Sequence, residues 1–454
     1  MTQNITLKLD LYEYSQVART CKLIAQKLGL REDEVEADLC RLTGLLEQYR
    51  DGQPSGPSGR RETRVEVPAA TATQCIAFLK EANLLQRINE LIGRAGITGE
   101  ETNRILLFVI ASSYKMPDTL HGLIQGSSGS GKTRLLKVIS GLMPEEDVKR
   151  YTRVTDNSFY NQEEYFFVHK LLCFEDLDGL KEDAQLAVRE LQSNGILITS
   201  TSVKDSSGRI SGGERTVRGP VASLACTTRG EVYEDNISRC FLIAVDESRE
   251  QTGHIIRYQN ELSAGLIDRE QERQAGAFIR NCIRLLKPYE VINPYAHKLR
   301  LPEEVHKIRR LNDLYQSFVR QITLMNQYRR KQDRQGRLIS EKEDLQAACD
   351  ILFESILLKA DELDGPLRGF YERLKSFVEP KGRDYMFNRF EVRTATGVSK
   401  TQQHYYLQKL VRLEYLRQSG FANRGFTYRI VHWDNMAALR GRIKDSLQRQ
   451  LDAL

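Results

Sequence analysis

One eight-residue loop constrains the fold of this 454-residue chain more than any other feature. Gly126-Ser127-Ser128-Gly129-Ser130-Gly131-Lys132-Thr133 matches the pattern G-x-x-x-x-G-K-[ST] at every required position. Such a loop joins a strand to a helix, and its glycines let backbone N–H groups surround phosphates. An apolar run at 120–125 and a helical pattern at 133–142 supply that context. The sequence therefore predicts an α/β domain in which this whole loop binds ATP.

Two side chains of the loop have distinct expected roles. The ammonium of Lys132 pairs with β- and γ-phosphate oxygens, and the hydroxyl of Thr133 is a ligand for Mg²⁺. The N-terminus of the following helix adds the positive end of its dipole. ATP and Mg²⁺ are therefore the expected cofactors.

A second nucleotide motif follows at Leu171-Leu172-Cys173-Phe174-Glu175-Asp176. Four apolar residues predict a buried strand, which we expect beside the strand that precedes the phosphate loop. Its two acids then emerge at the carboxyl edge of the sheet, where ligands bind. One carboxylate is expected to hold Mg²⁺ and the other to polarise the attacking water. The pattern leaves the division of roles between Glu175 and Asp176 open, and Asp178 is a weaker candidate.

Two further residues complete the predicted catalytic set. A third apolar run at 221–226 ends in Thr227-Thr228, and we expect Thr228 to orient the attacking water. Arg239 stands just before a fourth apolar run at 241–245. An arginine there can act as a finger that stabilises phosphoryl charge in a neighbouring subunit's site. The alternative for Arg239 is an ordinary surface ion pair.

Periodicity and composition divide the chain into six segments. Residues 1–50 form a helical region, with helices expected at 14–29 and 31–49. A Gly/Pro/Ser-rich stretch makes 51–67 a flexible linker. A helical segment at 68–117 precedes the α/β core at 118–260. A helical lid and connector occupy 261–380, and a compact mixed domain occupies 381–454.

Charge is concentrated at the end of the chain. Residues 381–454 carry 14 Lys+Arg and 6 Asp+Glu, a net +8, so the other 380 residues sum to −2 against a total of +6. Such a basic domain favours a polyanionic partner. No apolar run reaches about 18 residues and no signal peptide is evident, so we expect a cytoplasmic protein without membrane contact. The eight cysteines show no C-x-x-C spacing, which argues against zinc.

Taken together, these motifs resemble the AAA+ ATPases of the minichromosome-maintenance-like helicase branch. The similarity is greatest to the ATPase half of toprim-type primase–helicases of phages and mobile elements, over roughly residues 80–260. Besides the loop, it is carried by Gly99-Glu100-Glu101-Thr102-Asn103, Met143-Pro144-Glu145-Glu146-Asp147, His169-Lys170, Leu191-Gln192-Ser193, Val217-Arg218-Gly219-Pro220-Val221, Ser238-Arg239-Cys240 and Asp246-Glu247-Ser248-Arg249-Glu250-Gln251-Thr252.

The resemblance implies an AAA+ core with an α-helical lid, in an ATP-dependent DNA helicase that forms a ring, with six subunits expected. This sequence departs from the family's pattern in two ways. The acidic pair is Glu-Asp rather than Asp-Glu. The chain also lacks a zinc finger and a toprim segment, so primer synthesis would need a separate primase chain.

The resemblance also implies where DNA is contacted. Residues 195–203 and 210–218 predict a β-hairpin, and in this family a hairpin at that point projects into the central pore. Lys204 and Arg209 at its tip would contact phosphates, whereas the alternative is a surface hairpin. A lid arginine that touches the γ-phosphate is expected too. We assign it to Arg310, although Arg309 and a solvent-facing pair stay open as alternatives.

The C-terminal domain fits a winged helix-turn-helix. The expected elements are a helix at 387–393, a turn at 394–398, a helix at 400–410 capped by Ser399, and two strands at 416–419 and 426–430 around a wing. We expect an outward face with Lys400, Gln402, Gln403, His404 and Lys409. Of these, Lys400, Gln403 and Lys409, together with Arg424 of the wing, are the expected DNA contacts. Winged helices also bind proteins, which is the alternative.

The sequence also leaves two other classes of function open. The chain could be a DNA-binding or loading factor that uses ATP only as a switch and does not unwind. It could also be a regulatory ATPase acting on a protein, although the basic C-terminal domain argues against that class. The acidic pair and Arg239 favour hydrolysis within a ring.

Overall fold

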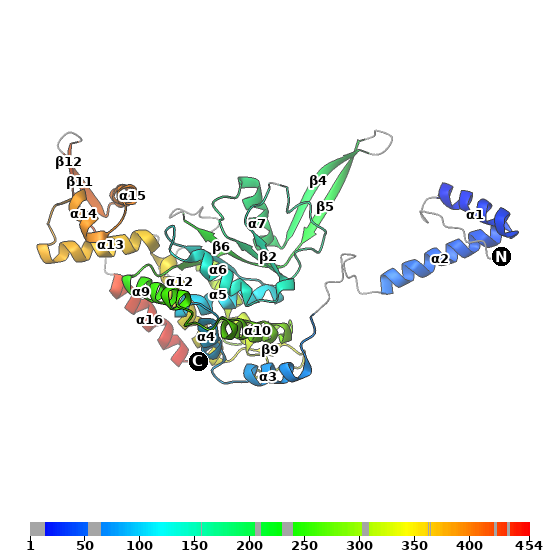
Figure 1. Ribbon diagram of the computed structural model, residues 1–454, viewed down its shortest axis with the longest axis horizontal. Coiled ribbons are helices and arrows are strands. Elements are labelled where there is room, and N and C mark those ends of the chain that lie inside the picture. The colour runs from blue at the N-terminus through cyan, green and yellow to red at the C-terminus, as the bar shows by residue number, and fades with distance from the viewer. Residues whose placement is uncertain are drawn as a thin grey trace. The chain divides into compact units, whose positions relative to one another are not determined.

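The computed structural model describes residues 14–52, 65–155, 157–204, 210–228, 239–301, 308–361, 363, 365–421, 425–433 and 436–454. The chain divides into two units, Met1–Glu62 and Thr63–Leu454. In the first unit, helices α1 (Tyr14–Leu28) and α2 (Glu32–Gly52) pack through Cys21, Ala25 and Val35 (Figure 1). Both predicted helices are confirmed. Helix α2 runs to Gly52, so it includes the first two residues of the predicted linker.

Three helices open the second unit: α3 (Ala69–Leu79), α4 (Leu84–Arg94) and α5 (Glu101–Ser112), which continues into the 3₁₀ turn η1 (Ser113–Lys115). Helix α5 is buried on all sides from Arg104 to Ser112. Its sequence is apolar over consecutive residues rather than along one stripe, which is typical of a central helix.

Within the described residues, five strands form one sheet in the order β2-β3-β6-β1-β7, and every pairing is parallel. The strands are β1 (His121–Gln125), β2 (Val148–Tyr151), β3 (Lys170–Phe174), β6 (Val221–Thr227) and β7 (Phe241–Ala244). The expected α/β sheet is confirmed. The expectation that β3 lies beside β1 is wrong, because β6 pairs with both and separates them.

Alternation along β6 shows how both faces of the sheet are covered. Val221 and Ala225 belong to one cluster, which includes helix α7 (Glu182–Asn194). Ala222, Leu224 and Cys226 belong to a larger cluster on the other face, shared with α5 and with α6 (Lys132–Gly141). A sheet buried on both faces has apolar strands without alternation in the sequence, which β6 shows.

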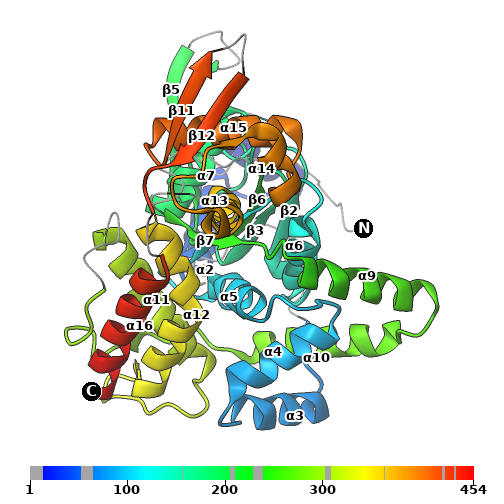
Figure 2. The ribbon, with the colours of Figure 1, turned by 90° about the vertical axis from the view of Figure 1, so that its left-hand side faces the viewer.

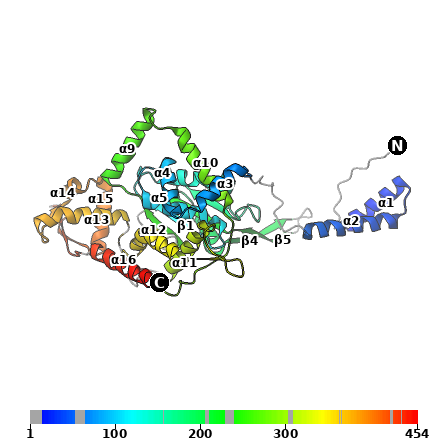
Figure 3. The same cartoon turned by 90° about the horizontal axis from the view of Figure 1, so that it is seen from below.

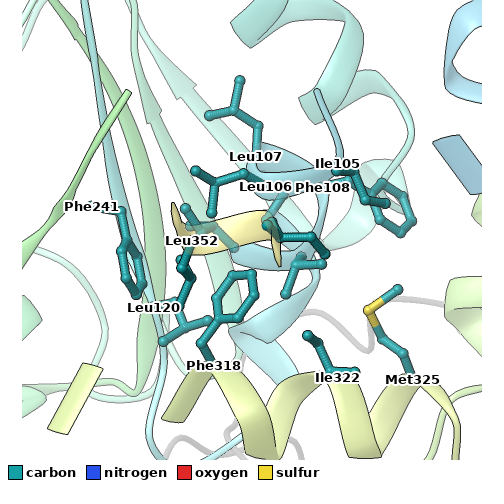
Figure 4. Close-up of a cluster of buried hydrophobic side chains, with 14 of the residues drawn as sticks. Ile105, Leu106, Leu107, Phe108, Leu120, Phe241, Phe318, Ile322, Met325 and Leu352 are labelled. Carbon is teal, nitrogen blue, oxygen red and sulfur yellow. The ribbon is translucent and has the colours of Figure 1, made fainter. Parts of the chain in front are cut away.

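Helices from the second half of the chain close the larger cluster. They are α10 (Arg269–Leu285), α11 (Ile308–Met325) and α12 (Lys342–Ala360). Helix α9 (Arg249–Ser263) precedes them and contributes no residue to this cluster. Figure 4 shows Phe318 and Ile322 of α11 directed at Leu106 and its neighbours on α5. Short strands β8 (Val291–Ile292) and β9 (Leu338–Ile339) pair in parallel between these helices. The region is thus largely helical, as predicted.

The predicted hairpin is confirmed as β4 (Ile196–Lys204) and β5 (Ile210–Arg218), which pair antiparallel along their length. The two strands extend away from the sheet as a long ribbon (Figure 1). In Figure 3, α9 and α10 form a second projection, meeting at an angle away from the sheet.

The C-terminal module has its own hydrophobic core, which runs from Leu363 to Ile430. Its elements are α13 (Gly365–Val378), the 3₁₀ turn η3 (Glu379–Lys381), β10 (Phe387–Asn388), α14 (Arg389–Thr396), α15 (Lys400–Arg412), β11 (Leu416–Phe421) and β12 (Gly425–Ile430). The three strands form one sheet in the order β10-β12-β11. The first of the two helices expected here begins at Arg389, because residues 387–388 pair with β12 and Asn388 caps the helix.

Two boundaries of this module differ from the predicted segment 381–454. Helix α13 shares the module's core, so the module begins near residue 363. The last helix, α16 (Met436–Asp452), instead contributes Ile443, Leu447 and Leu451 to the large cluster around α12. Seven of the eight cysteines are buried and Cys40 is exposed. In the part of the chain that the structure describes, no helix is long and apolar enough to cross a membrane.

Candidate functional site

The phosphate loop lies between the fully buried β1 and the N-terminus of α6, as the sequence predicts. Gly129 and Gly131 have φ angles of 82° and 96°, in the left-handed region that favours glycine. A Cβ atom at either position would meet no other atom within 4 Å, so the space above the loop is open. This is the arrangement in which a helix N-terminus binds an anion.

Two side chains of the loop fit a phosphate ligand. Lys132 is buried, and its Nζ donates to the carbonyls of Gly126 at 2.9 Å and Ser127 at 2.5 Å. The hydroxyl of Ser130 is buried and has no hydrogen-bond partner. A buried polar atom without a partner requires an explanation, and a bound phosphate or ion supplies one.

The acidic pair emerges from β3 at the same edge of the sheet. Glu175 Oε2 lies 3.2 Å from the Nζ of Lys137 on α6, and Asp176 Oδ1 accepts the backbone N–H of Asp178 at 3.1 Å. Burial raises the pKa of Cys226, at the end of β6, to about 12. The charge of Lys132 lowers that pKa, while the carboxylates of Glu175 and Asp176 raise it. The lysine and both acids are therefore close enough to act electrostatically on one buried thiol.

Asp178, the weaker candidate beside the acidic pair in the sequence, has a positioning role in the structure. Its Oδ1 accepts the hydroxyl of Thr227 at 2.8 Å. Its Oδ2 accepts the backbone N–H of Thr228 at 2.8 Å and the Thr228 hydroxyl at 3.1 Å. The loop after β3 is thereby fixed to the end of β6. Thr228 lies at the expected edge, with its hydroxyl held by a carboxylate.

Oxygen donors at this edge suit magnesium. Thr133 supplies a hydroxyl, and Glu175 and Asp176 supply carboxylates, which are ligands that Mg²⁺ prefers. Among the described residues, no cluster of three or more His, Cys, Asp or Glu side chains is arranged to hold a metal by itself.

A cavity of about 320 Å³ adjoins the phosphate loop. The sequence motifs do not predict this cavity. It is lined by three loop residues, Gly129, Ser130 and Gly131, by Arg134 and Leu135 of α6, and by two other groups of residues. One group, from the segment before α5, is Gly96, Ile97, Thr98 and Glu100. The other, from β7 and α9, includes Val245, Gln251, Ile255, Tyr258 and Leu262. A largely apolar cavity beside a phosphate site suits the base of a nucleotide.

Side chains hold the segment before α5 in place through its carbonyl groups. Arg134 donates to the carbonyl of Gly96 at 3.1 Å, and Gln251 to that of Thr98 at 2.8 Å. The buried Arg104 donates to the carbonyls of Ile97 and Gly99. Gly99 has a φ of 66°, and a Cβ there would lie 2.0 Å from Gln251 Oε1, so only glycine fits.

Glu247 connects the phosphate loop to α9. Its Oε1 accepts the backbone N–H of Ser127 at 2.6 Å, and its Oε2 accepts the Ser127 hydroxyl at 2.9 Å. Burial raises the pKa of the neighbouring Glu100, whose Oε1 accepts the N–H of Asp246 at 2.8 Å. The segment between β7 and α9 therefore contacts both the phosphate loop and the wall of the cavity.

Comparison with known proteins agrees with this geometry. Residues 69–288 match a family model described as the MTBMA_p00010 P-loop domain. The chain contains a P-loop ATPase domain. A 92-residue stretch is also 36% identical to the cytochrome c biogenesis ATP-binding export protein CcmA of Reclinomonas americana. That match covers 20% of this chain and 37% of the relative, so the chain spans well under half of that protein's length.

Arg239 lies at the opposite edge of the ATPase domain from the phosphate loop. It precedes β7, whose first residue, Phe241, pairs with Gly122 near the start of β1. The phosphate loop follows the other end of β1. Arg239 Nε donates to the hydroxyl of Ser193 at the end of α7. Because the strands are parallel, Arg239 and the phosphate loop of this chain lie at opposite ends of the strands and are separated by the strands' length.

The predicted lid arginines do not line the nucleotide cavity. Arg309 and Arg310 are exposed in the first turn of α11, which packs on α5, α12 and β8. Among the described residues, α9 is the helix that lines the cavity beyond the phosphate loop and α6. The structure therefore does not bring Arg310 to the phosphate loop. A contact from this helix would need a second subunit or a different arrangement of α11.

The expected DNA contacts are described only in part. Lys204 is the last residue of β4, whereas Arg209 and Arg424 lie outside the described residues. On α15, Ser399 caps the helix as predicted, Lys400 is exposed and Lys409 is half-buried. The expectation that Gln403 faces outward is wrong. Its side chain is buried and donates to the carbonyl of Arg389 on α14, because it lies on the face with Tyr406, Leu407 and Leu410.

Proposed function

We propose that this chain is a ring-forming, ATP-dependent DNA helicase of the replicative type found in phages and mobile elements. The observation that carries the proposal is the separation of Arg239 from the phosphate loop. An arginine at the far edge of the sheet cannot serve its own nucleotide, but it can serve a neighbour's in a closed ring. A six-subunit ring is the form that the resemblance to the minichromosome-maintenance-like branch implies.

In this proposal, the nucleotide is bound by groups at the carboxyl edge of the sheet. The loop 126–133 takes the phosphates, and the cavity between Ile97, Ile255 and Tyr258 takes the base. Thr133 and the acidic pair would hold Mg²⁺, which screens phosphate charge and orients the γ-phosphoryl group. Glu175 or Asp176 accepts a proton from the attacking water. Thr228, held by Asp178, is placed to orient that water.

Two elements support DNA as the partner. The β4–β5 hairpin extends from the ATPase domain at the point where the helicases that the sequence resembles carry a pore hairpin. The C-terminal module has the element order of a winged helix-turn-helix, with α14 and α15 as the helix pair and β11–β12 as the wing. Its charge and the exposed Lys400 favour a polyanion. A separate primase chain is part of the proposal, since primer synthesis needs another catalytic domain.

Strand separation tests the proposal directly. The chain is incubated with a fluorescently labelled forked duplex and ATP, and release of the labelled strand is followed over time. We expect release that requires hydrolysable ATP and is lost in Lys132→Ala. A factor that binds or loads on DNA would instead bind the fork with ATP but release no strand. That outcome would contradict the helicase proposal while leaving ATP hydrolysis intact.

A further inference from the structure

Exposed aromatic side chains are concentrated in the C-terminal module. In the described part of the chain, five aromatic side chains are exposed, and four of them lie in this module: Phe390, Tyr405, Phe421 and Phe426. The fifth is Tyr165. Phe421 and Phe390 are 77% and 71% exposed, although the module already has a core of its own. Folding of the module therefore does not account for these side chains, and a binding surface does.

The register of β11 and β12 places one phenylalanine on each side of the ribbon. Leu416 pairs with Ile430 and Gln418 with Tyr428, and the apolar members of these pairs face the core. Side chains alternate along a strand. Phe426 thus shares the inner face with Tyr428 but lies beyond the core, whereas Phe421 is on the outer face. In Figure 2, the two strands extend past α15. Phe421 is the last residue of β11 and Phe426 the second residue of β12, so both lie where the two strands meet at one end of the ribbon.

Positive charge lies on the outer face of the ribbon, which carries Phe421, and beside two of the exposed rings on the helices. Arg417 and Arg429 are cross-strand partners on the outer face, the face of Phe421. Like charges in that position repel unless an anion lies between them. Arg429 has an ion pair with the exposed Asp384 at 3.3 Å. On the helices, Arg389 lies 5.6 Å from the ring of Phe390, and Lys409 lies 5.8 Å from that of Tyr405.

We propose that the β11–β12 ribbon binds unpaired nucleotides by stacking bases on Phe421 and Phe426, so that the C-terminal module takes single-stranded DNA. Every base has a π-face, but in a duplex those faces are covered by neighbouring bases, so only an unpaired strand offers them. Arg417 and Arg429, on the same face of the ribbon as Phe421, supply the phosphate contacts. This inference rests on the proposed function, because it takes the module's partner to be DNA.

The first test measures binding by the full-length chain to a fluorescein-labelled oligothymidylate and to a duplex of equal length. We expect Phe421→Ala to weaken single-strand binding by about fivefold to a hundredfold, the range that loss of one aromatic–base stack gives. Duplex affinity and the salt dependence of binding should stay unchanged, since no phosphate contact is lost. Arg417→Ala is the matched comparison, and it should weaken binding and reduce the salt dependence.

Two further substitutions separate stacking from simple apolar contact. Phe421→Leu keeps an apolar side chain but has no π-face, so it should behave like Phe421→Ala, whereas Phe421→Trp should bind at least as well as the wild type. The chain has a single tryptophan, Trp433. In a Trp433→Phe background, the fluorescence of Phe421→Trp should therefore be quenched by oligothymidylate and not by the duplex.

The outcomes distinguish this inference from the proposed function. Unchanged single-strand binding in Phe421→Ala and Phe426→Ala, with the wild type still binding DNA, overturns the inference alone. If Phe421→Leu binds the single strand as well as the wild type, the ring makes only an apolar contact, as in docking to a protein. That result also overturns the inference. A wild-type chain that binds neither oligonucleotide contradicts the proposed function itself.

Discussion

At the residue scale, the strongest constraint is the buried ammonium of Lys132, whose Nζ contacts the carbonyls at the start of the phosphate loop. In Lys132→Ala, the phosphates lose their nearest cation. We expect ATP hydrolysis to fall on the order of a hundredfold or more, as loss of such a charge-stabilising donor does. Phosphate release measures this. Lys342→Ala removes an exposed lysine at the start of α12 and should hydrolyse ATP normally. Turnover near the wild-type rate in Lys132→Ala would reject the site.

The acidic pair is tested by Glu175→Gln and Asp176→Asn. An amide cannot accept a proton and is a poor Mg²⁺ ligand, so hydrolysis should slow about a hundredfold or more while ATP binding persists. Glu175 also pairs with Lys137, so Lys137→Ala shows whether the effect of Glu175→Gln comes only from that ion pair. Glu182→Gln, an exposed acid at the start of α7, should be silent. If both amide variants turn over like the wild type, neither acid is catalytic.

At the scale of elements, the structure adds a role for helix α9, which lines the cavity beside the phosphate loop. Tyr258 lines the cavity beside the phosphate loop, accepts a hydrogen bond from Arg134 and donates one to Glu272. Ile256 is on the same helix but is exposed and does not line the cavity. We expect Tyr258→Ala to weaken binding of a fluorescent ATP analogue by about tenfold, near 1.4 kcal/mol. At saturating ATP, turnover should largely recover.

The control for that prediction is Ile256→Ala, which should bind the analogue like the wild type. If Ile256→Ala and Tyr258→Ala lose affinity equally, the loss reflects the stability of α9 rather than contact with the base. If neither loses affinity, the cavity is not the base site. Thermal denaturation of both variants without nucleotide shows whether either substitution unfolds the domain.

What the sequence could predict follows from how local each feature is. The loop 126–133, its flanking strand and helix, and the β4–β5 hairpin are each set by contiguous residues, and all three were predicted. The order of strands is a tertiary property, so the position of β3 two strands from β1 was not predicted correctly. The edge strand β2 was missed because Val148-Lys149-Arg150-Tyr151 is only partly buried and lacks an apolar run.

Features built from distant segments escaped the sequence analysis for the same reason. The base cavity combines residues near 97, 130 and 255, which no single motif joins. The inward direction of Gln403 depends on the rotation of α15 about its axis, which its polar sequence leaves ambiguous. One signal for the cavity was present in the sequence. Gln251, Ile255, Tyr258 and Leu262 recur at helical spacing on α9, and this stripe faces the phosphate loop.

At the scale of the whole molecule, the proposed function makes the ATPase site of one chain incomplete by itself. Its phosphate loop, acidic pair and Thr228 lie at the carboxyl edge of the sheet, whereas Arg239 lies at the opposite edge. The proposed ring would place the Arg239 edge of each subunit against the nucleotide edge of the next. Electron microscopy of negatively stained particles with ATP and DNA should therefore show closed rings. Particles that remain single chains under those conditions would count against assembly.

Mixing two inactive variants tests the central claim, that the ATPase site is shared between subunits, most directly. Lys132→Ala subunits have a defective phosphate loop but an intact Arg239. Arg239→Ala subunits should bind ATP normally yet hydrolyse it on the order of a thousandfold more slowly, as loss of an arginine finger does. In a mixed ring, some interfaces join an intact loop to an intact Arg239. We predict that ATP hydrolysis by the co-assembled mixture rises well above the sum of the two separate activities. A mixture that demonstrably co-assembles but shows only that sum would contradict the shared site.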